Sequence, residues 1–236
     1  MRSMSARIAA VNQRLGEACR RSGRSRDEVR VIAVTKYVSN ETASEAFEAG
    51  LRHLGENRWP DAKTKLETVG ARSEASPLWH FIGSLQSRKV KDVVGRFAYV
   101  HSLDRLSLAR AIDAQAQQLG ITVPCMIQVN VSGEASKHGL APEELHAFAR
   151  AVAGLEGIEV AGLMTMAPHA DEAEAARPVF RGLRELRDEL NALALLRRPA
   201  LELSMGMSGD FEVAVEEGAT WVRLGSILVG REEENA

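Results

Sequence analysis

The sequence contains few of the residues that mark a secreted, metal-binding or membrane protein. Only two cysteines, Cys19 and Cys125, occur among its 236 residues. Cysteines so far apart do not form a disulfide framework, and they lack the close spacing of a metal site. No apolar run approaches the ~20 residues of a membrane-spanning helix, and the first residues contain no long apolar segment of a secretory signal. We therefore expect a cytoplasmic protein with no metal site and no membrane partner.

An excess of positive charge is also lacking. Thirty lysine and arginine residues stand against 32 aspartate and glutamate residues, which gives a net charge of −2 at pH 7. Proteins that bind nucleic acid or anionic lipid depend on a basic surface, so neither partner is expected. No H-E-x-x-H, Walker A or G-x-S-x-G motif occurs either. The motifs therefore assign no catalytic residue.

Lysine is scarce, with six residues against 24 arginines. Lys36 ends the apolar stretch VIAVTK, which is typical of a buried strand. An amine can lose its proton when desolvated or placed near another cation, whereas a guanidinium cannot. Lys36 is thus either a strand-end lysine that reaches water or a reactive amine, and Lys137, in the loop SGEASKHG, is the second candidate amine. The remaining four lie in or beside predicted helices and are expected to be solvated: Lys63, Lys65, Lys89 and Lys91.

Apolar segments alternate with helical patterns along the whole chain. The expected strands are 30–35, 52–54, 78–83, 98–102, 124–131, 158–166, 201–204 and 220–225. The expected helices after the first seven are 40–50, 61–70, 87–96, 104–120, 142–154, 171–196 and 210–218. This alternation predicts a parallel sheet covered by helices, and eight units in just under ~250 residues predict a closed (β/α)8 TIM-type barrel. The doubly wound Rossmann class is the alternative, but no G-x-G-x-x-G follows the first strand. We expect one domain over residues 1–236, with an extra N-terminal helix.

Two turns of small residues follow the seventh and eighth predicted strands, SMGMSGD and LGSILVG. Glycine lets the backbone close around an anion, and N–H groups at the start of a helix supply donors. In TIM barrels the loops after these two strands form the common phosphate site. A phosphate site is therefore predicted, with ordinary left-handed turns as the alternative. Together with Lys36 on the same rim, it suggests a Schiff base with a phosphorylated aldehyde.

Two other polar residues lie within predicted strands. Arg223 lies between Val222 and Leu224 in the last strand. Its side chain can point into the barrel or out of it, and the sequence leaves both open. His80 lies in the apolar stretch LWHFIG, where a hydrogen-bonded structural histidine is the favoured interpretation.

Six stretches resemble, in order, the motifs of the pyridoxal phosphate homeostasis protein family. They are AVTK, HLGENR, WHFIGSLQSRK, IQVNVSGEASKHG, GLMTM and LSMGMSGDFEVAVEEGATWVRLGSILVG. The resemblance extends from about Ile8 to Gly230, nearly the whole chain. It implies the alanine-racemase-like barrel known as fold type III, and it implies binding of pyridoxal 5′-phosphate (PLP).

The resemblance also assigns residues to the cofactor site. Lys36 matches the lysine that forms the internal aldimine with PLP, Asn57 matches a residue beside the cofactor, and Arg223 matches the arginine that faces the pyridine nitrogen. Met164 in GLMTM is included, although methionines at this spacing are by themselves more typical of packing. The residues matched to the phosphate side are Ser204, Gly206, Ser208, Gly209, Gly225 and Ser226. Two departures, Tyr37-Val38 after the lysine and Ser226 in place of threonine, leave this chemistry unchanged.

The implied function is storage, buffering or delivery of PLP inside the cell by a monomer, with apo PLP-dependent enzymes as recipients. An arginine opposite the ring nitrogen leaves the pyridine neutral and the electron sink weak, unlike a carboxylate. The sequence shows no counterpart of the β-rich domain that gives alanine racemases a second acid/base, and Tyr37 is expected to point away from Lys36. We therefore expect a carrier without robust turnover. A weak amino-acid racemase, a Schiff-base aldolase and a second PLP site at Lys137 stay open.

Overall fold

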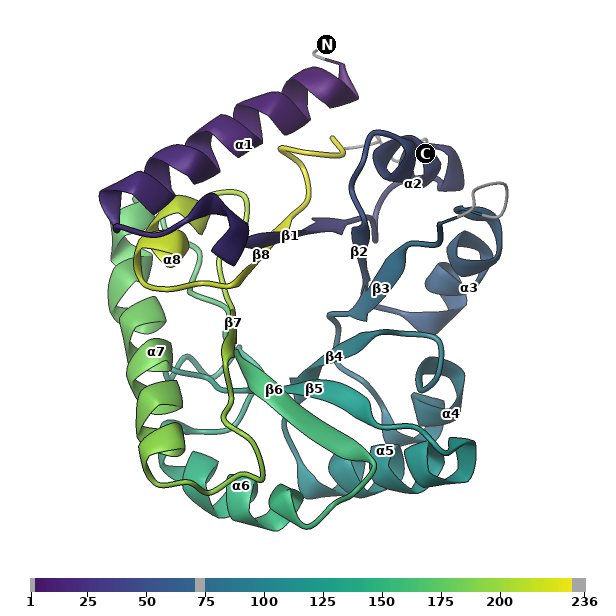
Figure 1. The fold of residues 1–236 in the computed structure, drawn as a ribbon, viewed down its shortest axis with the longest axis vertical. Coiled ribbons are helices and arrows are strands. Elements are labelled where there is room, and N and C mark those ends of the chain that lie inside the picture. The colour runs from purple at the N-terminus through teal and green to yellow at the C-terminus, as the bar shows by residue number, and fades with distance from the viewer. Residues whose placement is uncertain (1–2, 71–74, 231–236) are drawn as a thin grey trace.

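Eight parallel strands form a closed barrel in the computed structural model, which describes residues 3–70 and 75–230 (Figure 1). The strands follow one another around the barrel in chain order, and the eighth closes the ring by pairing with the first. They are β1 (Arg30–Val34), β2 (His53–Glu56), β3 (Leu78–Phe81), β4 (Tyr99–Leu103), β5 (Val123–Gln128), β6 (Ile158–Met164), β7 (Glu202–Ser204) and β8 (Trp221–Leu224). The predicted (β/α)8 barrel is confirmed.

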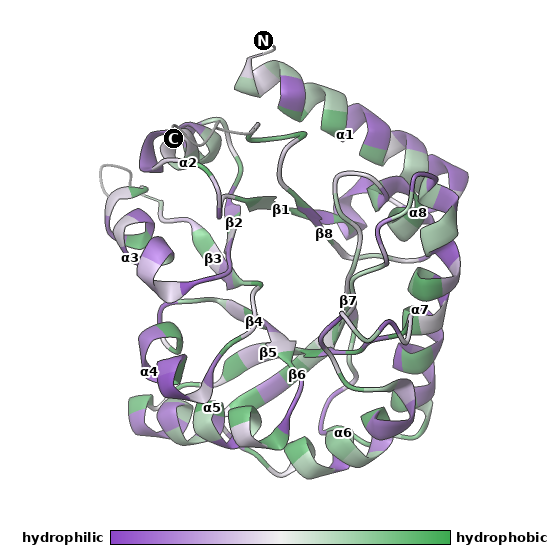
Figure 2. Cartoon of the chain, turned by 180° about the vertical axis from the view of Figure 1, so that it is seen from behind, coloured by the Kyte–Doolittle hydropathy of each residue, from purple (hydrophilic) through white to green (hydrophobic). Residues whose placement is uncertain are grey.

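Helices surround the barrel, and one follows each of the first seven strands (Figure 1). They are α2 (Asn40–Glu48), α3 (Trp59–Thr68), α4 (Val90–Val93), α5 (Leu106–Leu119), α6 (Leu145–Ala153), α7 (Arg177–Ala192) and α8 (Phe211–Glu216). Hydrophobic and hydrophilic residues alternate along the helices (Figure 2). This is expected where one helix face covers a strand and the other faces water. No helix in the described ranges is long and apolar enough to cross a membrane.

Two predicted helices differ most from their expected length. The 171–196 pattern contains a 3-10 turn at Ala173–Ala176 and then α7, which begins with Pro178 in its first turn, where the missing N–H costs nothing. The 87–96 pattern forms only a 3-10 turn and the single α-turn α4. Val94 is already extended there and Gly95 has a φ of +85°, so the chain leaves the helical conformation early.

The N-terminal helix α1 (Met4–Arg21) completes the outer ring (Figure 1). After β8 the described chain forms turns at 226–229 and no helix. No helix that follows β8 in the described residues therefore covers the outer face of this strand. Helix α1 packs here against α8, with ion pairs Arg14–Glu212 at 2.6 Å and Arg21–Glu216 at 2.7 Å. The side chains that it buries are Val11, Leu15, Ala18 and Cys19. The predicted extra helix therefore takes the place of an eighth one.

The barrel interior is separate from the main core. Ile32, Met126, Met164 and Trp221 form a small apolar cluster of their own, and they come from β1, β5, β6 and β8. Because these strands are not all neighbours, their side chains meet inside the barrel. The rest of the interior is polar, since His80, His101, Ser204 and Arg223 are also buried.

Candidate functional site

The carboxyl ends of β1, β2 and β8 lie side by side at one rim of the barrel. Val34 near the end of β1 pairs with Gly55 of β2, and Ile32 pairs with Arg223 of β8. A Cβ on Gly225, the residue after β8, would lie 3.7 Å from that of Val34. Lys36 follows Val34 by two residues, so the topology brings the lysine and the last glycine turn to the same rim.

Lys36 lies just beyond the end of β1 and is partly exposed. Its Nζ lies 4.7 Å from the centroid of the Tyr37 ring, whose residue is 74% exposed. The prediction that Tyr37 points away from Lys36 is wrong. It assumed that the strand alternation continues, whereas β1 ends at Val34 and the chain turns at Lys36.

A buried ion pair fixes the backbone next to Lys36. Lys65 of α3 is only 5% exposed, and its ammonium donates to the Thr35 carbonyl at 2.5 Å and to Glu56 Oε1 at 3.0 Å. The Thr35 hydroxyl donates to the same Glu56 oxygen at 2.6 Å. Burial raises the pKa of Glu56, while the Thr35 hydroxyl and Lys65 favour its charged form. The cluster therefore ties the ends of β1 and β2 together, directly before Lys36 and Asn57.

The expectation that Lys65 is solvated is wrong. Ala62, Lys65 and Val69 recur at helical spacing, and all three are buried. This spacing places Lys65 on the buried face of α3. It was the signal in the sequence that Lys65 is buried and needs a charged partner.

Arg223 points into the barrel, which settles the orientation that the sequence left open. Its Nη1 donates to Ser204 Oγ at 2.7 Å, and its Nη2 donates to the Thr165 carbonyl at 2.9 Å. The Nε–H has no hydrogen bond within the described residues. Burial lowers the pKa of Arg223 to about 10, so it remains a cation at neutral pH. Ser204, predicted on the phosphate side, thus has its hydroxyl bound to Arg223.

The two glycine turns contact each other beside the ends of β7 and β8. The Gly225 N–H donates to Ser208 Oγ at 3.3 Å, which joins the turns. Gly206 has a φ of +91°, and a Cβ there would lie 2.6 Å from that of Ala214. Five N–H groups in these turns have no hydrogen-bond partner in the described chain: those of Gly206, Ser208, Gly209, Ser226 and Ile227. Such donors fit an anion better than an ordinary closed turn.

Asn57 and Met164, the other two residues predicted to bind the cofactor, lie outside the two glycine turns. Asn57 directly follows β2, and Gly83 packs so closely on it that a Cβ would lie 2.3 Å from the Asn57 carbonyl oxygen. Met164 ends β6 and is 1% exposed in the interior apolar cluster with Trp221. Its packing role is visible, and contact of either residue with a cofactor stays a prediction.

Comparison with known proteins identifies the family. The alanine racemase N-terminal domain model matches residues 8–233. The pyridoxal phosphate homeostasis protein of Aquifex aeolicus (strain VF5) is 42% identical over 95% of this chain and 96% of its own. The chain belongs to the pyridoxal phosphate homeostasis protein family. Its Pseudomonas aeruginosa member is 41% identical over 100% of this chain and 99% of its own. PipY of Synechococcus elongatus PCC7942, solved with PLP bound, superposes with a TM-score of 0.82 at 33% identity, covering 97% of this chain and 100% of PipY.

Lys137 lies in a folded loop after β5, away from the two glycine turns in sequence. The Asn130 amide donates to the carbonyls of Glu134 at 2.9 Å and Lys137 at 3.4 Å, and the Lys137 N–H donates to Glu134 O at 3.0 Å. The loop is thus held by its own backbone, and the Lys137 residue is partly exposed.

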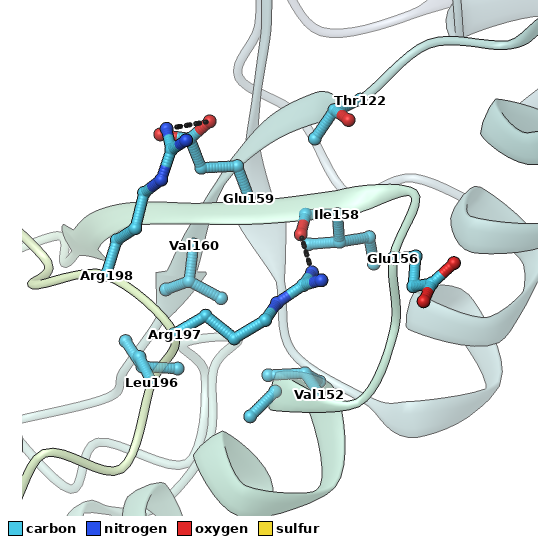
Figure 3. A pocket seen from close by; sticks show the side chains of 10 residues that line it. Thr122, Val152, Glu156, Ile158, Glu159, Val160, Leu196, Arg197 and Arg198 are labelled. Atoms are coloured by element: carbon cyan, nitrogen blue, oxygen red, sulfur yellow. Dashed lines mark hydrogen bonds and ion pairs between the residues drawn. The ribbon is translucent and has the colours of Figure 1, made fainter.

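A pocket of about 330 Å³ lies at the opposite end of the strands (Figure 3). Ile158 and Glu159, the first residues of β6, contribute to it. Arg197 donates to the Ile158 carbonyl at 3.0 Å, and Arg198 pairs with Glu159 at 3.7 Å (Figure 3). Because it begins at the amino-terminal end of β6, the pocket is not part of the rim site.

Gly206→Ala is expected to destabilise the protein by about 2 kcal/mol or more, because the substitution adds a clash with Ala214 to an unfavourable positive φ. Gly209→Ala is the matched control. Gly209 has no positive φ and nothing within 4 Å of its Cβ position, so a change within about 0.5 kcal/mol is expected. Urea denaturation followed by circular dichroism measures both. Equal stability of the two variants would contradict the described turn.

Proposed function

We propose that this protein binds PLP as an internal aldimine on Lys36 and serves to store, buffer or deliver it to apo PLP-dependent enzymes. The observation that carries the proposal is the common rim: Lys36 at the end of β1, with Arg223 and the glycine turns at the ends of β8 and β7. PipY, solved with PLP bound, has the same fold over nearly all of this chain.

The residues of the rim fit the chemical groups of PLP. The cofactor has an aldehyde, a phosphate and a pyridine nitrogen. The Lys36 amine can condense with the aldehyde as water leaves, and the free N–H groups around Ser208 and Ser226 suit the phosphate. Bound PLP supplies an electron sink, whose strength depends on protonation of the ring.

Arg223 limits what such a site does with an amino acid. Its two terminal nitrogens are bound to Ser204 and Thr165, and its Nε–H is left as a donor. A guanidinium that stays charged donates a hydrogen bond to a pyridine nitrogen without transferring its proton. The ring therefore stays neutral, which favours retention of the cofactor over turnover.

Borohydride reduction tests the lysine. Protein incubated with PLP and then reduced should carry a pyridoxyl group on Lys36, measured by absorbance and peptide mass spectrometry. Lys36→Ala should lose this adduct, whereas Lys63→Ala, which changes an exposed lysine of α3, should keep it. Undiminished modification in Lys36→Ala would refute Lys36 as the anchor. An adduct that persists at Lys137 would instead reveal the second amine.

Two further measurements separate the alternative activities. Chiral analysis of alanine and serine after long incubation with the loaded protein detects a racemase. Protein that forms a borohydride adduct with an aldehyde substrate but releases no PLP on acid treatment would instead be a Schiff-base aldolase. For a carrier, we expect stable amino-acid chirality and transfer of PLP to an added apo enzyme.

A further inference from the structure

Three histidines form a continuous hydrogen-bonded chain that ends at Arg223. His53 Nδ1 lies 3.0 Å from His80 Nε2, and His80 Nδ1 lies 2.9 Å from His101 Nε2. His101 Nδ1 lies 2.9 Å from Ser204 Oγ, the oxygen that accepts from Arg223 Nη1 at 2.7 Å. Every link has ordinary hydrogen-bond length.

The chain of three histidines crosses the barrel interior from one end toward the other. His53 is the first residue of β2 and is partly exposed, whereas Ser204 is the last residue of β7 and is fully buried. His101 of β4 reaches Ser204 although β4 and β7 are not neighbours in the barrel. The chain thus connects the amino-terminal end of the barrel with the cation of the proposed cofactor site.

The number of donors and acceptors along the histidine chain determines in which direction its hydrogen bonds are donated. His80 and His101 use both ring nitrogens, so each neutral ring donates through one nitrogen and accepts through the other. Arg223 can only donate, so it occupies one lone pair of Ser204 Oγ. If the Ser204 hydroxyl donates to His101 Nδ1, every link is satisfied and all the rings carry their proton on Nε2. The reverse direction leaves the buried hydroxyl proton without a partner among the described residues.

The surroundings keep these rings neutral. Burial, followed by the charge of Arg223, lowers the pKa of His101 to about 3. Burial, followed by the neighbouring histidines, lowers the pKa of His80 well below its ordinary value. Burial and then Arg30 lower the pKa of His53. No three His, Cys, Asp or Glu side chains in the described chain are arranged to hold a metal ion, so the histidines serve one another as partners.

We propose that His53, His80 and His101 are positioning residues, a relay of neutral imidazoles that orients the Ser204 hydroxyl and thereby Arg223 from the far end of the barrel. For its effect on PLP the proposal rests on the proposed function, but the direction of the relay is a property of the protein alone. A proton that enters at His53 converts its Nδ1 from acceptor to donor. The links must then reverse, and the Nδ1–H of His101 would point at Ser204 beside the arginine.

Charged and aromatic groups around His53 set the pH at which this happens. Trp221 of β8 lies edge-on to His53 with ring centroids 4.8 Å apart, and the Arg30 guanidinium lies 4.0 Å from the centroid of the Trp221 ring. Arg30 of β1 is paired with Glu202 of β7. Tyr99 of β4 stacks on His80 at 5.0 Å. Arg30 opposes a proton on His53 and Glu202 partly compensates, so reversal is expected only below the ordinary histidine range.

Nitrogen-15 NMR of the PLP-free protein tests the direction. His80 and His101 are expected as Nε2–H tautomers at pH 7, and the ring of His169, which is exposed and lies outside the histidine chain, serves as the reference signal. Nδ1–H tautomers at both positions would overturn the proposal. Failure of PLP binding would refute only the proposed function, because this measurement involves no cofactor.

Substitutions then test whether the relay reaches Arg223. The Arg223 Nε–H resonance of the PLP-free protein should shift as His53 titrates, and His101→Phe should abolish that shift, whereas His169→Phe should not. His101→Asn places an amide where Nδ1 was and should recover part of the PLP affinity, which His101→Phe lowers by about tenfold through loss of one hydrogen-bonded contact. An Arg223 resonance that still follows His53 in His101→Phe, or equal PLP affinity in all variants, would contradict the relay.

Discussion

Between pH 7 and pH 5 the protein is expected to lose about 2 kcal/mol of unfolding free energy through His101 alone. The pKa of this fully buried ring is lowered to about 3, first by burial and then by Arg223. An unfolded histidine has a pKa of about 6.5, so below that pH the unfolded state binds a proton that the folded state refuses. Stability is therefore intact above this pKa, and it falls as the pH drops toward the folded pKa.

His80 adds to the loss in the same direction, because its pKa is also lowered by burial. Carboxylates with lowered pKa values act in a separate window. Glu216 and Glu217 keep their stabilising pairs with arginines until the pH falls below the usual carboxylate range. The loss between pH 7 and pH 5 is thus expected from the histidines with lowered pKa values, His53, His80 and His101.

Urea denaturation at a series of pH values measures this loss. His101→Asn removes one titrating ring, so its stability should depend less steeply on pH, whatever its stability at pH 7. His169→Gln is the matched control, since His169 is exposed and the slope should not change. Identical slopes for the wild type and His101→Asn would show that His101 is not held neutral.

Lys65→Met is expected to cost about 3–5 kcal/mol of unfolding free energy, because it leaves the Glu56 carboxylate buried without its cation. Glu56 is 0% exposed, and its Oε2 already has no hydrogen-bond partner in the described residues. The Thr35 carbonyl also loses the donor at 2.5 Å that fixes the backbone before Lys36. PLP occupancy of the variant should fall with stability, since the same contact orients the anchoring lysine.

A double substitution separates the ion pair from its members. Glu56→Gln combined with Lys65→Met removes both charges, and the pair of changes should cost about 1–3 kcal/mol less than the sum of the two single changes. Lys63→Met, on the exposed side of the same helix, should change stability by no more than about 0.5 kcal/mol. Calorimetric or urea-induced unfolding measures the unfolding free energy of the two single variants at Glu56 and Lys65, of the double variant and of Lys63→Met. Additive costs for Glu56 and Lys65 would mean that the two side chains do not interact.

Much of the architecture was predictable from local pattern. The apolar strands and the helices between them gave the barrel, because a buried parallel strand needs an unbroken apolar run and a crossover helix after it. Boundaries were less predictable where local conformation ended an element early. Gly95 shortened α4, and the end of β1 at Val34 directed Tyr37 toward Lys36.

The sequence by itself determined the barrel, the family and the positions of Lys36 and the two glycine turns, since each depends on residues close together in the chain. Only the tertiary structure decided that Arg223 points inward, that Lys65 is buried against Glu56, and that a chain of histidines ends at Ser204. These contacts join residues on different strands and helices. Which residues become partners depends on barrel closure and on the need of buried polar groups for hydrogen bonds. Neither can be read from a local sequence pattern.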